Sequence, residues 1–206
     1  MKNLKTPILI FLLASLCACG IVKIDNRPEA LSVDERLELA SIYLARGEHE
    51  LAKREYSKVI ETDKTSALAY FGMGNVYLKL KDFKEAESNY LKAIRIEPAN
   101  SAFYNNLAWA FMEQGEYGKA GNAAKMAIDG DRERDYIYLD TLGVIQTRQK
   151  KFLEAEETFL NATNRDRAAK AGADGLKEIY DHLLELYTVT GEDEKALSLR
   201  DRLKGL

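Results

Sequence analysis

One stretch, Ala67–Asn100, constrains the fold of this chain more than any other feature of its sequence. Within Tyr70–Tyr77 the apolar residues recur at the i, i+3, i+4, i+7 spacing of one helix face. Lys81-Asp82 interrupts that pattern, and a second apolar stripe begins at Phe83. Pro98 ends the second stripe, because a proline cannot continue a helix. The stretch therefore predicts a helix, a turn and a second helix.

The same alternation recurs along most of the chain. One alanine near the start of each second helix marks the period, and successive alanines lie 34, 34, 35 and 41 residues apart. These alanines are Ala52, Ala86, Ala120, Ala155 and Ala196. The period predicts repeats near residues 33–66, 67–100, 101–135, 136–169 and 177–206. Helix pairs that recur in this way bury their apolar faces by stacking on one another.

The stretch Ala67–Asn100 resembles the tetratricopeptide repeat (TPR), in which large and small residues occupy fixed places of a helix-turn-helix unit. Gly74, Tyr77, Ala86 and Pro98 stand where that family has its glycine, tyrosine, alanine and proline. The resemblance implies an all-α fold, an α-α superhelix (TPR solenoid) of five helix-turn-helix repeats. It covers nearly all of the chain after residue 32.

Some positions depart from the regular pattern. Gly118 and Gly121 lie inside the second helix of the third repeat, and each glycine costs a helix about 1 kcal/mol against alanine. Ala124 replaces the usual aromatic residue there, so we expect this helix to be the weakest. Seven extra residues, 170–176, are almost two helical turns and are compatible with a backward extension of the first helix of the fifth repeat, but Gly172 and Gly175 among them leave that extension open. Three repeats end their first helix at a glycine, the usual left-handed cap: Gly47, Gly115 and Gly191.

The N-terminal residues 1–18 are predicted to be a lipoprotein signal peptide. Lys2 and Lys5 precede an apolar run of about nine residues, which is too short for the ~20 residues that cross a bilayer as a helix. Leu16, Ala18 and Cys19 resemble the cleavage motif of bacterial lipoproteins. The resemblance implies lipidation of Cys19 by acyl chains such as palmitate. The alternative is an ordinary signal peptide that happens to contain cysteines.

Residues 19–32 form a short polar segment, which we interpret as a lipidated tether. At ~3.3–3.6 Å per residue this tether reaches at most about 45 Å, so the repeats should stay close to the membrane. Gly20 follows the lipidated cysteine, and in enteric-type sorting an aspartate there would retain a lipoprotein at the inner membrane. We therefore expect an outer-membrane anchor with the repeats facing the periplasm.

Charge and motifs argue against several classes of function. The formal net charge of -3 gives no basic face for nucleic acid. The sequence shows no phosphate-binding loop, dinucleotide fingerprint, zinc motif or Ser/His/Asp arrangement, so we expect no catalytic residue, cofactor or metal. Asp181, His182 and Glu185 have the spacing of possible metal ligands, but a charged helix face explains them better.

The family resemblance places the first helix of each repeat on the concave side of the solenoid. Acidic residues fall at both ends of that side, and its centre is rich in aromatic and amide side chains. The predicted partner-binding groove consists of Phe71, Asn75, Lys79, Asn105, Asn106, Trp109, Met112, Asp140 and Arg148. We expect the partner to be an extended or helical protein segment with an apolar centre and a basic flank.

A TPR solenoid on a lipid anchor resembles the pilotin-like lipoproteins of type IV pilus and tight-adherence systems. That resemblance implies a scaffold that binds proteins while a pilus or a secretin is assembled. Alternatives are a TPR lipoprotein of cell-envelope assembly, cell division or polysaccharide export. A more remote alternative is an enzyme or a small-molecule binder.

Overall fold

The computed structural model describes residues 31–163 and 166–204, with the backbone alone for residues 166–171. These residues contain ten helices and no strand. The helices are α2 (Val33–Ala45), α3 (His49–Thr62), α4 (Ala67–Lys79), α5 (Phe83–Ile96), α6 (Ser101–Glu113), α7 (Tyr117–Gly130), α8 (Asp135–Arg148), α9 (Phe152–Thr163), α10 (Asp166–Thr190) and α11 (Asp193–Leu203). All of them lie in one unit, Ser32–Leu206. The signal peptide, Cys19 and most of the tether lie outside the described residues.

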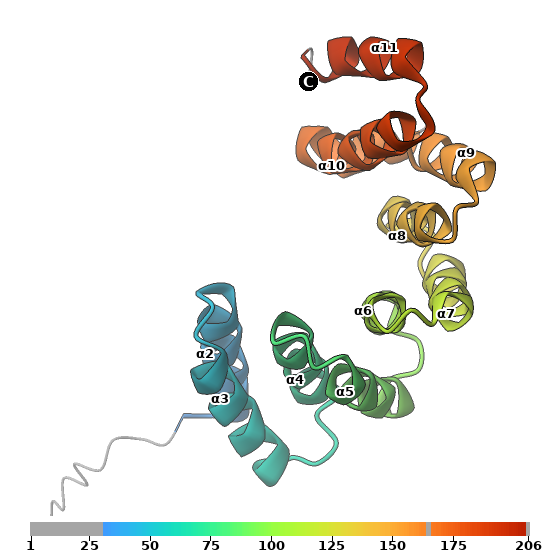
Figure 1. Ribbon diagram of the computed structural model, residues 1–206. Coiled ribbons are helices and arrows are strands. Elements are labelled where there is room, and N and C mark those ends of the chain that lie inside the picture. The colour runs from blue at the N-terminus through green and yellow to red at the C-terminus, as the bar shows by residue number, and fades with distance from the viewer. Residues whose placement is uncertain (1–30, 164–165, 205–206) are drawn as a thin grey trace, which may run out of the picture. The chain divides into compact units, whose positions relative to one another are not determined.

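The helices of this unit pair into five repeats, α2–α3, α4–α5, α6–α7, α8–α9 and α10–α11. Among the described residues each helix contacts only helices of its own repeat and of the neighbouring repeats. The first helix of each repeat also contacts the first helix of the next, so these five helices form one inner layer. Figure 1 shows the pairs stacked in an arc with that layer on its inner side. The predicted all-α superhelix of five repeats is confirmed.

The first helix of the first repeat begins where the sequence places it. The Ser32 side-chain oxygen accepts a hydrogen bond from the backbone N–H of Glu35 at 3.3 Å. In return the Glu35 carboxylate accepts one from the backbone N–H of Ser32 at 2.8 Å. This reciprocal cap satisfies two N–H groups that a helix start leaves without partners. Ser66, Asp82 and Asn100 cap later helices with their side chains.

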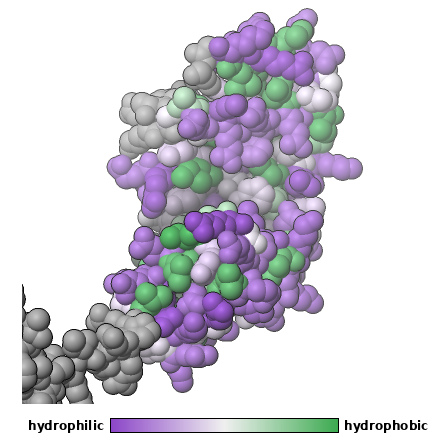
Figure 2. All heavy atoms as spheres, turned by 90° about the vertical axis from the view of Figure 1, so that its left-hand side faces the viewer, coloured by the Kyte–Doolittle hydropathy of each residue, from purple (hydrophilic) through white to green (hydrophobic). Residues whose placement is uncertain are grey.

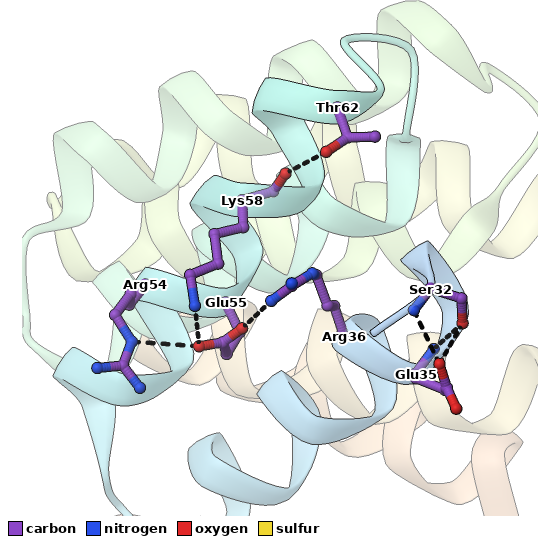
Figure 3. Close-up of polar contacts among 7 residues, drawn as sticks. All are labelled: Ser32, Glu35, Arg36, Arg54, Glu55, Lys58 and Thr62. Carbon is purple, nitrogen blue, oxygen red and sulfur yellow. Dashed lines mark hydrogen bonds and ion pairs between the residues drawn. The ribbon is translucent and has the colours of Figure 1, made fainter. Parts of the chain in front are cut away.

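A buried carboxylate joins the two helices of the first repeat. Glu55 of α3 is 3% exposed, and its Oε2 lies 2.8 Å from Arg36 Nη1 of α2. Its Oε1 lies 2.8 Å from Lys58 Nζ and 3.1 Å from Arg54 Nε (Figure 3). The hydrogen bond from Lys58, helped by the two arginines, lowers the pKa of Glu55 despite its burial. The buried charge is therefore fully paired, as such a group must be to be tolerated in a core.

The turn between the two helices of a repeat needs a left-handed residue. Gly47, Gly115 and Gly191 have φ of 75°, 76° and 76°, which confirms the prediction from sequence. Lys81 and Lys150 take the same place in the other two repeats, with φ of 62° and 61°. A side chain in this region costs roughly 1–2 kcal/mol, so these two turns are held by their surroundings rather than by local preference.

Close approach of paired helices depends on glycine opposite a ring. A Cβ atom added at Gly74 would lie 2.5 Å from Tyr90 Cε1, and one added at Gly143 would lie 2.5 Å from Phe159 Cε1. Both rings are almost fully buried, so they have little room to move. The third repeat instead buries Ala124, which is 0% exposed, where the first, second and fourth repeats have Tyr56, Tyr90 and Phe159.

The extra residues before the fifth repeat only partly extend its first helix. The α10 segment begins at Asp166, but Gly172 has φ 67° and ψ 178°, which are not helical values. Residues 173–190 therefore form the regular helix, and a kink separates them from residues 166–171. The first helix of the fifth repeat is therefore extended backwards by four residues, 173–176, and it stops at Gly172, since glycine adopts this backbone conformation without strain.

Candidate functional site

The concave side is formed by α2, α4, α6, α8 and α10. Figure 2 shows the chain from the side toward which the arc of Figure 1 opens. Hydrophobic residues lie there in separate patches among hydrophilic ones. The surface is recessed at mid-height, between the repeats at the lower end and those at the upper end of this view. The predicted groove residues all come from α4, α6 and α8, so their exposure and partners decide which of them can meet another protein.

Three predicted groove residues at the junction of the second and third repeats contact other side chains of the protein. Asn75 Oδ1 accepts hydrogen bonds from Tyr90 Oη and from Asn106 Nδ2, each at 2.8 Å. The Phe71 ring packs on Phe103 and Tyr90 at centroid distances of 4.8 Å and 5.8 Å. These hydrogen bonds support the junction of α4, α5 and α6, so Asn75 Oδ1 and Asn106 Nδ2 are engaged within the protein.

Met112 differs from its predicted role, and Lys79 lies at the edge of the predicted groove. Met112 is only 4% exposed and belongs to the core between the second, third and fourth repeats, so it offers no surface for apolar contact. The family pattern placed it on the concave side, but the residues of this core cover it. Lys79 is exposed at the last position of α4, beside the turn.

The structure gathers the remaining predicted residues around Trp109. On one side of this residue lies a cavity of about 310 Å³ between α6, α8 and α10. Its lining residues are Asn105, Trp109, Tyr136, Ile137, Asp140, Thr141, Gly175, Glu178 and Ile179. We call this space the Trp109 cavity. On the other side of Trp109 a smaller hollow of about 100 Å³ includes Arg148, Phe159, His182 and Glu185 in its lining.

Asn105 is the unpaired polar group of the Trp109 cavity. The residue is 9% exposed, and its buried Oδ1 has no hydrogen-bond partner among the described residues. Most buried polar atoms are paired, so an unpaired one marks a place where a further hydrogen bond can form. Asn105 and Asn106 both belong to the predicted groove, but Asn105 lines this cavity whereas Asn106 bonds Asn75.

A histidine–aspartate pair links α8 to α10 at the same place. His182 Nδ1 lies 2.9 Å from Asp140 Oδ1 and 3.0 Å from Asp140 Oδ2. The His182 ring also stacks on the buried ring of Phe159, with 6.2 Å between centroids. The hydrogen bond to Asp140 raises the pKa of His182, and the nearby carboxylates of Glu178 and Glu185 act in the same direction.

Sequence reasoning placed Asp140 on the concave side but did not pair it with His182. They are 42 residues apart, and the seven extra residues before the fifth repeat hide the register between α8 and α10. Among the described residues no three histidine, cysteine or acidic side chains converge as metal ligands. The Asp181, His182 and Glu185 alternative is thus replaced by a pairing of His182 with Asp140.

Membrane insertion can be assessed for the described helices alone. None of these helices combines the length and the apolar character that a membrane-spanning helix needs. The predicted anchor at Cys19 falls outside this part of the chain.

Comparison with protein families and known proteins agrees with this architecture. Tetratricopeptide-repeat models match residues 67–100 and 89–121, and a TPR-repeat model matches residues 40–81. The chain is 30% identical over 171 residues to the type IV pilus assembly protein PilF of Pseudomonas aeruginosa, covering 77% of this chain and 66% of PilF. It is 35% identical over 68 residues to stress-induced-phosphoprotein 1 of Caenorhabditis elegans, covering 33% of this chain and 21% of that protein.

A solved structure confirms the fold over a longer span. The crystal structure of PilW, described as a widely conserved type IV pilus biogenesis factor, superposes with a TM-score of 0.74 at 17% identity. The match covers 84% of this chain and 76% of PilW. At this identity the superposition speaks for the architecture alone. The repeat models, the relatives and the stacked helix pairs agree, and this chain therefore belongs to the tetratricopeptide repeat family.

Proposed function

We propose that this protein is a lipid-anchored scaffold that binds a protein segment at the Trp109 cavity during assembly of a type IV pilus or a related envelope machine. The observation that carries the proposal is the cavity itself, where Trp109, an unpaired amide and two carboxylates surround an open space between three repeats. The similarity to PilF supports the choice of machine. TPR proteins commonly work by binding other proteins, which agrees with a non-enzymatic role.

The cavity has the features of a binding surface rather than of a gap in the core. Trp109 lines both hollows and is only partly buried, so its ring is available on more than one side. Tryptophan is enriched among the residues that contribute most to protein interfaces. What PilF or PilW binds is a property of those proteins. That this protein shares a partner with them is part of the proposal.

Photocrosslinking in living cells tests the binding role. A photoreactive residue at Glu178, on the rim of the Trp109 cavity, should crosslink to an envelope protein that mass spectrometry identifies. The matched control is the same residue at Met126 of α7, which is 54% exposed and outside this cavity. Identical crosslinks from both positions, or none from Glu178, would refute the site.

The Trp109→Ala variant measures how much the cavity contributes. A central interface tryptophan typically contributes about 2 kcal/mol or more, so binding to the crosslinked partner should weaken roughly 30-fold. Its circular dichroism and melting temperature must be compared with those of the wild type, to separate lost binding from lost folding.

The anchor forms a separate part of the proposal. Cys19→Ser should release the protein from membranes or block its maturation, because only Cys19 has a small residue before it. Cys17→Ser is the matched control and should fractionate with the outer membrane like the wild type. Acylation and membrane fractionation that persist in Cys19→Ser would exclude lipidation at that residue.

A further inference from the structure

The Trp109 cavity carries negative charge from two of its three helices. Asp140 contributes a carboxylate from α8 and Glu178 contributes one from α10. No lysine or arginine stands among the described residues that line this cavity. Glu178 is exposed and forms no ion pair with any described residue, whereas Asp140 is shared with His182. The cavity therefore favours a cation over an anion.

Its neutral groups favour the same kind of ligand. The Trp109 ring forms one wall, and a cation placed over a tryptophan face is attracted by the negative charge of the ring's π-system. The amide of Asn105 lacks a partner for Oδ1, and rotation of this amide can present its oxygen to a donor in the cavity. Asp140 also has lone pairs that its contact with His182 Nδ1 does not occupy.

We propose that the Trp109 cavity binds a lysine or arginine side chain of the partner protein, stacked on Trp109 and hydrogen-bonded to Asp140 and Glu178. The inference rests on the proposed function, since it assumes that this cavity is where a protein partner docks. It places a basic residue at the centre of the concave side, where the sequence predicted an apolar centre with a basic flank.

The chemistry of the cavity disfavours the other occupants. An apolar side chain would remove water from Glu178 and Asn105 without giving either of them a partner. An acidic side chain would meet two carboxylates of like charge. Arginine suits the site better than lysine, because its planar guanidinium can stack on a ring and bond a carboxylate with two N–H groups.

The fluorescence of Trp109 offers a direct test, because it is the only tryptophan of the chain. The full-length protein in detergent is titrated with blocked five-residue peptides that differ only at the central residue. That residue is arginine, lysine, phenylalanine, glutamate or citrulline, which is the uncharged isostere of arginine. The arginine peptide should bind about fivefold more tightly than the citrulline peptide, and 0.5 M salt should shrink the difference.

A charge-neutral variant separates the site from general attraction to an acidic protein. Glu178→Gln lies on an exposed position, and it should reduce the preference for arginine over citrulline about threefold. Glu61 of α3 is also exposed and does not line the Trp109 cavity. Glu61→Gln should therefore leave that preference unchanged.

Two outcomes would overturn the inference. Equal binding of the citrulline or phenylalanine peptide would exclude a cationic anchor while leaving the protein-binding function intact. The absence of any fluorescence response to these peptides would overturn the anchor as well. Crosslinking from position 178 reports separately on the proposed function, because it does not depend on the chemistry of the partner's side chain.

Discussion

The second repeat and the junction of the third, fourth and fifth repeats show opposite uses of the same kind of residue. In the second repeat, Asn75 Oδ1 accepts hydrogen bonds from Tyr90 and from Asn106 of the third repeat, so these polar groups are paired within the protein. Beside Trp109, the residue Asn105 lines an open cavity, and its buried Oδ1 has no hydrogen-bond partner among the described residues. The difference teaches that the position of a residue on the concave helices does not decide its availability; the neighbouring repeat does.

The largest expected effect is a loss of stability in the second repeat, where the side chains are fully packed and paired. Tyr90→Ala removes a ring that is 0% exposed and should cost about 3–5 kcal/mol of unfolding free energy, measured by denaturant titration. Trp109→Ala, at a partly exposed position, should cost only about 1 kcal/mol. Equal losses for the two variants would mean that Trp109 is a core residue. Tyr90→Phe, which removes only the hydroxyl, should lose about 1 kcal/mol.

Glycines sharpen the comparison between tightly and loosely packed helices. Gly143→Ala should cost about 1–3 kcal/mol, because the new methyl group would displace the buried ring of Phe159. Gly121→Ala should instead stabilise the third repeat by about 0.5–1 kcal/mol, because nothing lies within 4 Å of the added Cβ. Thermal melts of both variants check the signs. A stabilised Gly143→Ala would show that the two helices of the fourth repeat can move apart freely.

The amides themselves provide the next test. Asn75→Leu leaves two donors without their acceptor and should cost about 1–3 kcal/mol of unfolding free energy. Asn105→Leu replaces an unpaired amide by an apolar group of similar size, so its stability should stay within about 1 kcal/mol of the wild type. Chemical denaturation of the two variants measures this contrast. A large loss in Asn105→Leu would mean that Asn105 has a structural partner after all.

The smallest expected effect concerns pH. The folded state raises the pKa of His182 above its unfolded value of about 6.5, chiefly through the hydrogen bond to Asp140. The pair therefore stabilises the folded protein fully below that unfolded pKa, and this contribution is lost as pH rises through the folded pKa. Unfolding free energies at pH 5.5 and pH 8.5 should differ less in Asp140→Asn than in the wild type. The same pH dependence in both proteins would remove Asp140 as the cause.

Much of the fold followed from local patterns in the sequence. The alternation of large and small residues gave the five repeats, because a helix pair that cannot bury its apolar face alone must stack on another. Gly47, Gly115 and Gly191 marked three turns through a backbone conformation that glycine adopts without strain. The kink at Gly172, by contrast, did not follow from the sequence, because a sequence does not state which glycine will leave helical geometry.

The candidate site was predictable in part. The repeat pattern placed Asn105, Trp109, Asp140 and Arg148 on the concave helices, and the structure brings all four around the two hollows beside Trp109. It also placed Phe71, Asn75, Asn106 and Met112 there, where side-chain packing and hydrogen bonds now account for them. Helix periodicity gives the direction of a side chain, but it does not give the distance to the next repeat.

The sequence by itself determined the repeat and the pairing of helices, since these depend on apolar spacing and on turn residues, and its family resemblance indicated the side on which the first helices lie. Only the tertiary structure decided which polar groups find partners. The bonds of Asn106 to Asn75 and of His182 to Asp140 span 31 and 42 residues, and each joins two repeats. Their formation depends on how closely one repeat packs on the next, which no single repeat encodes.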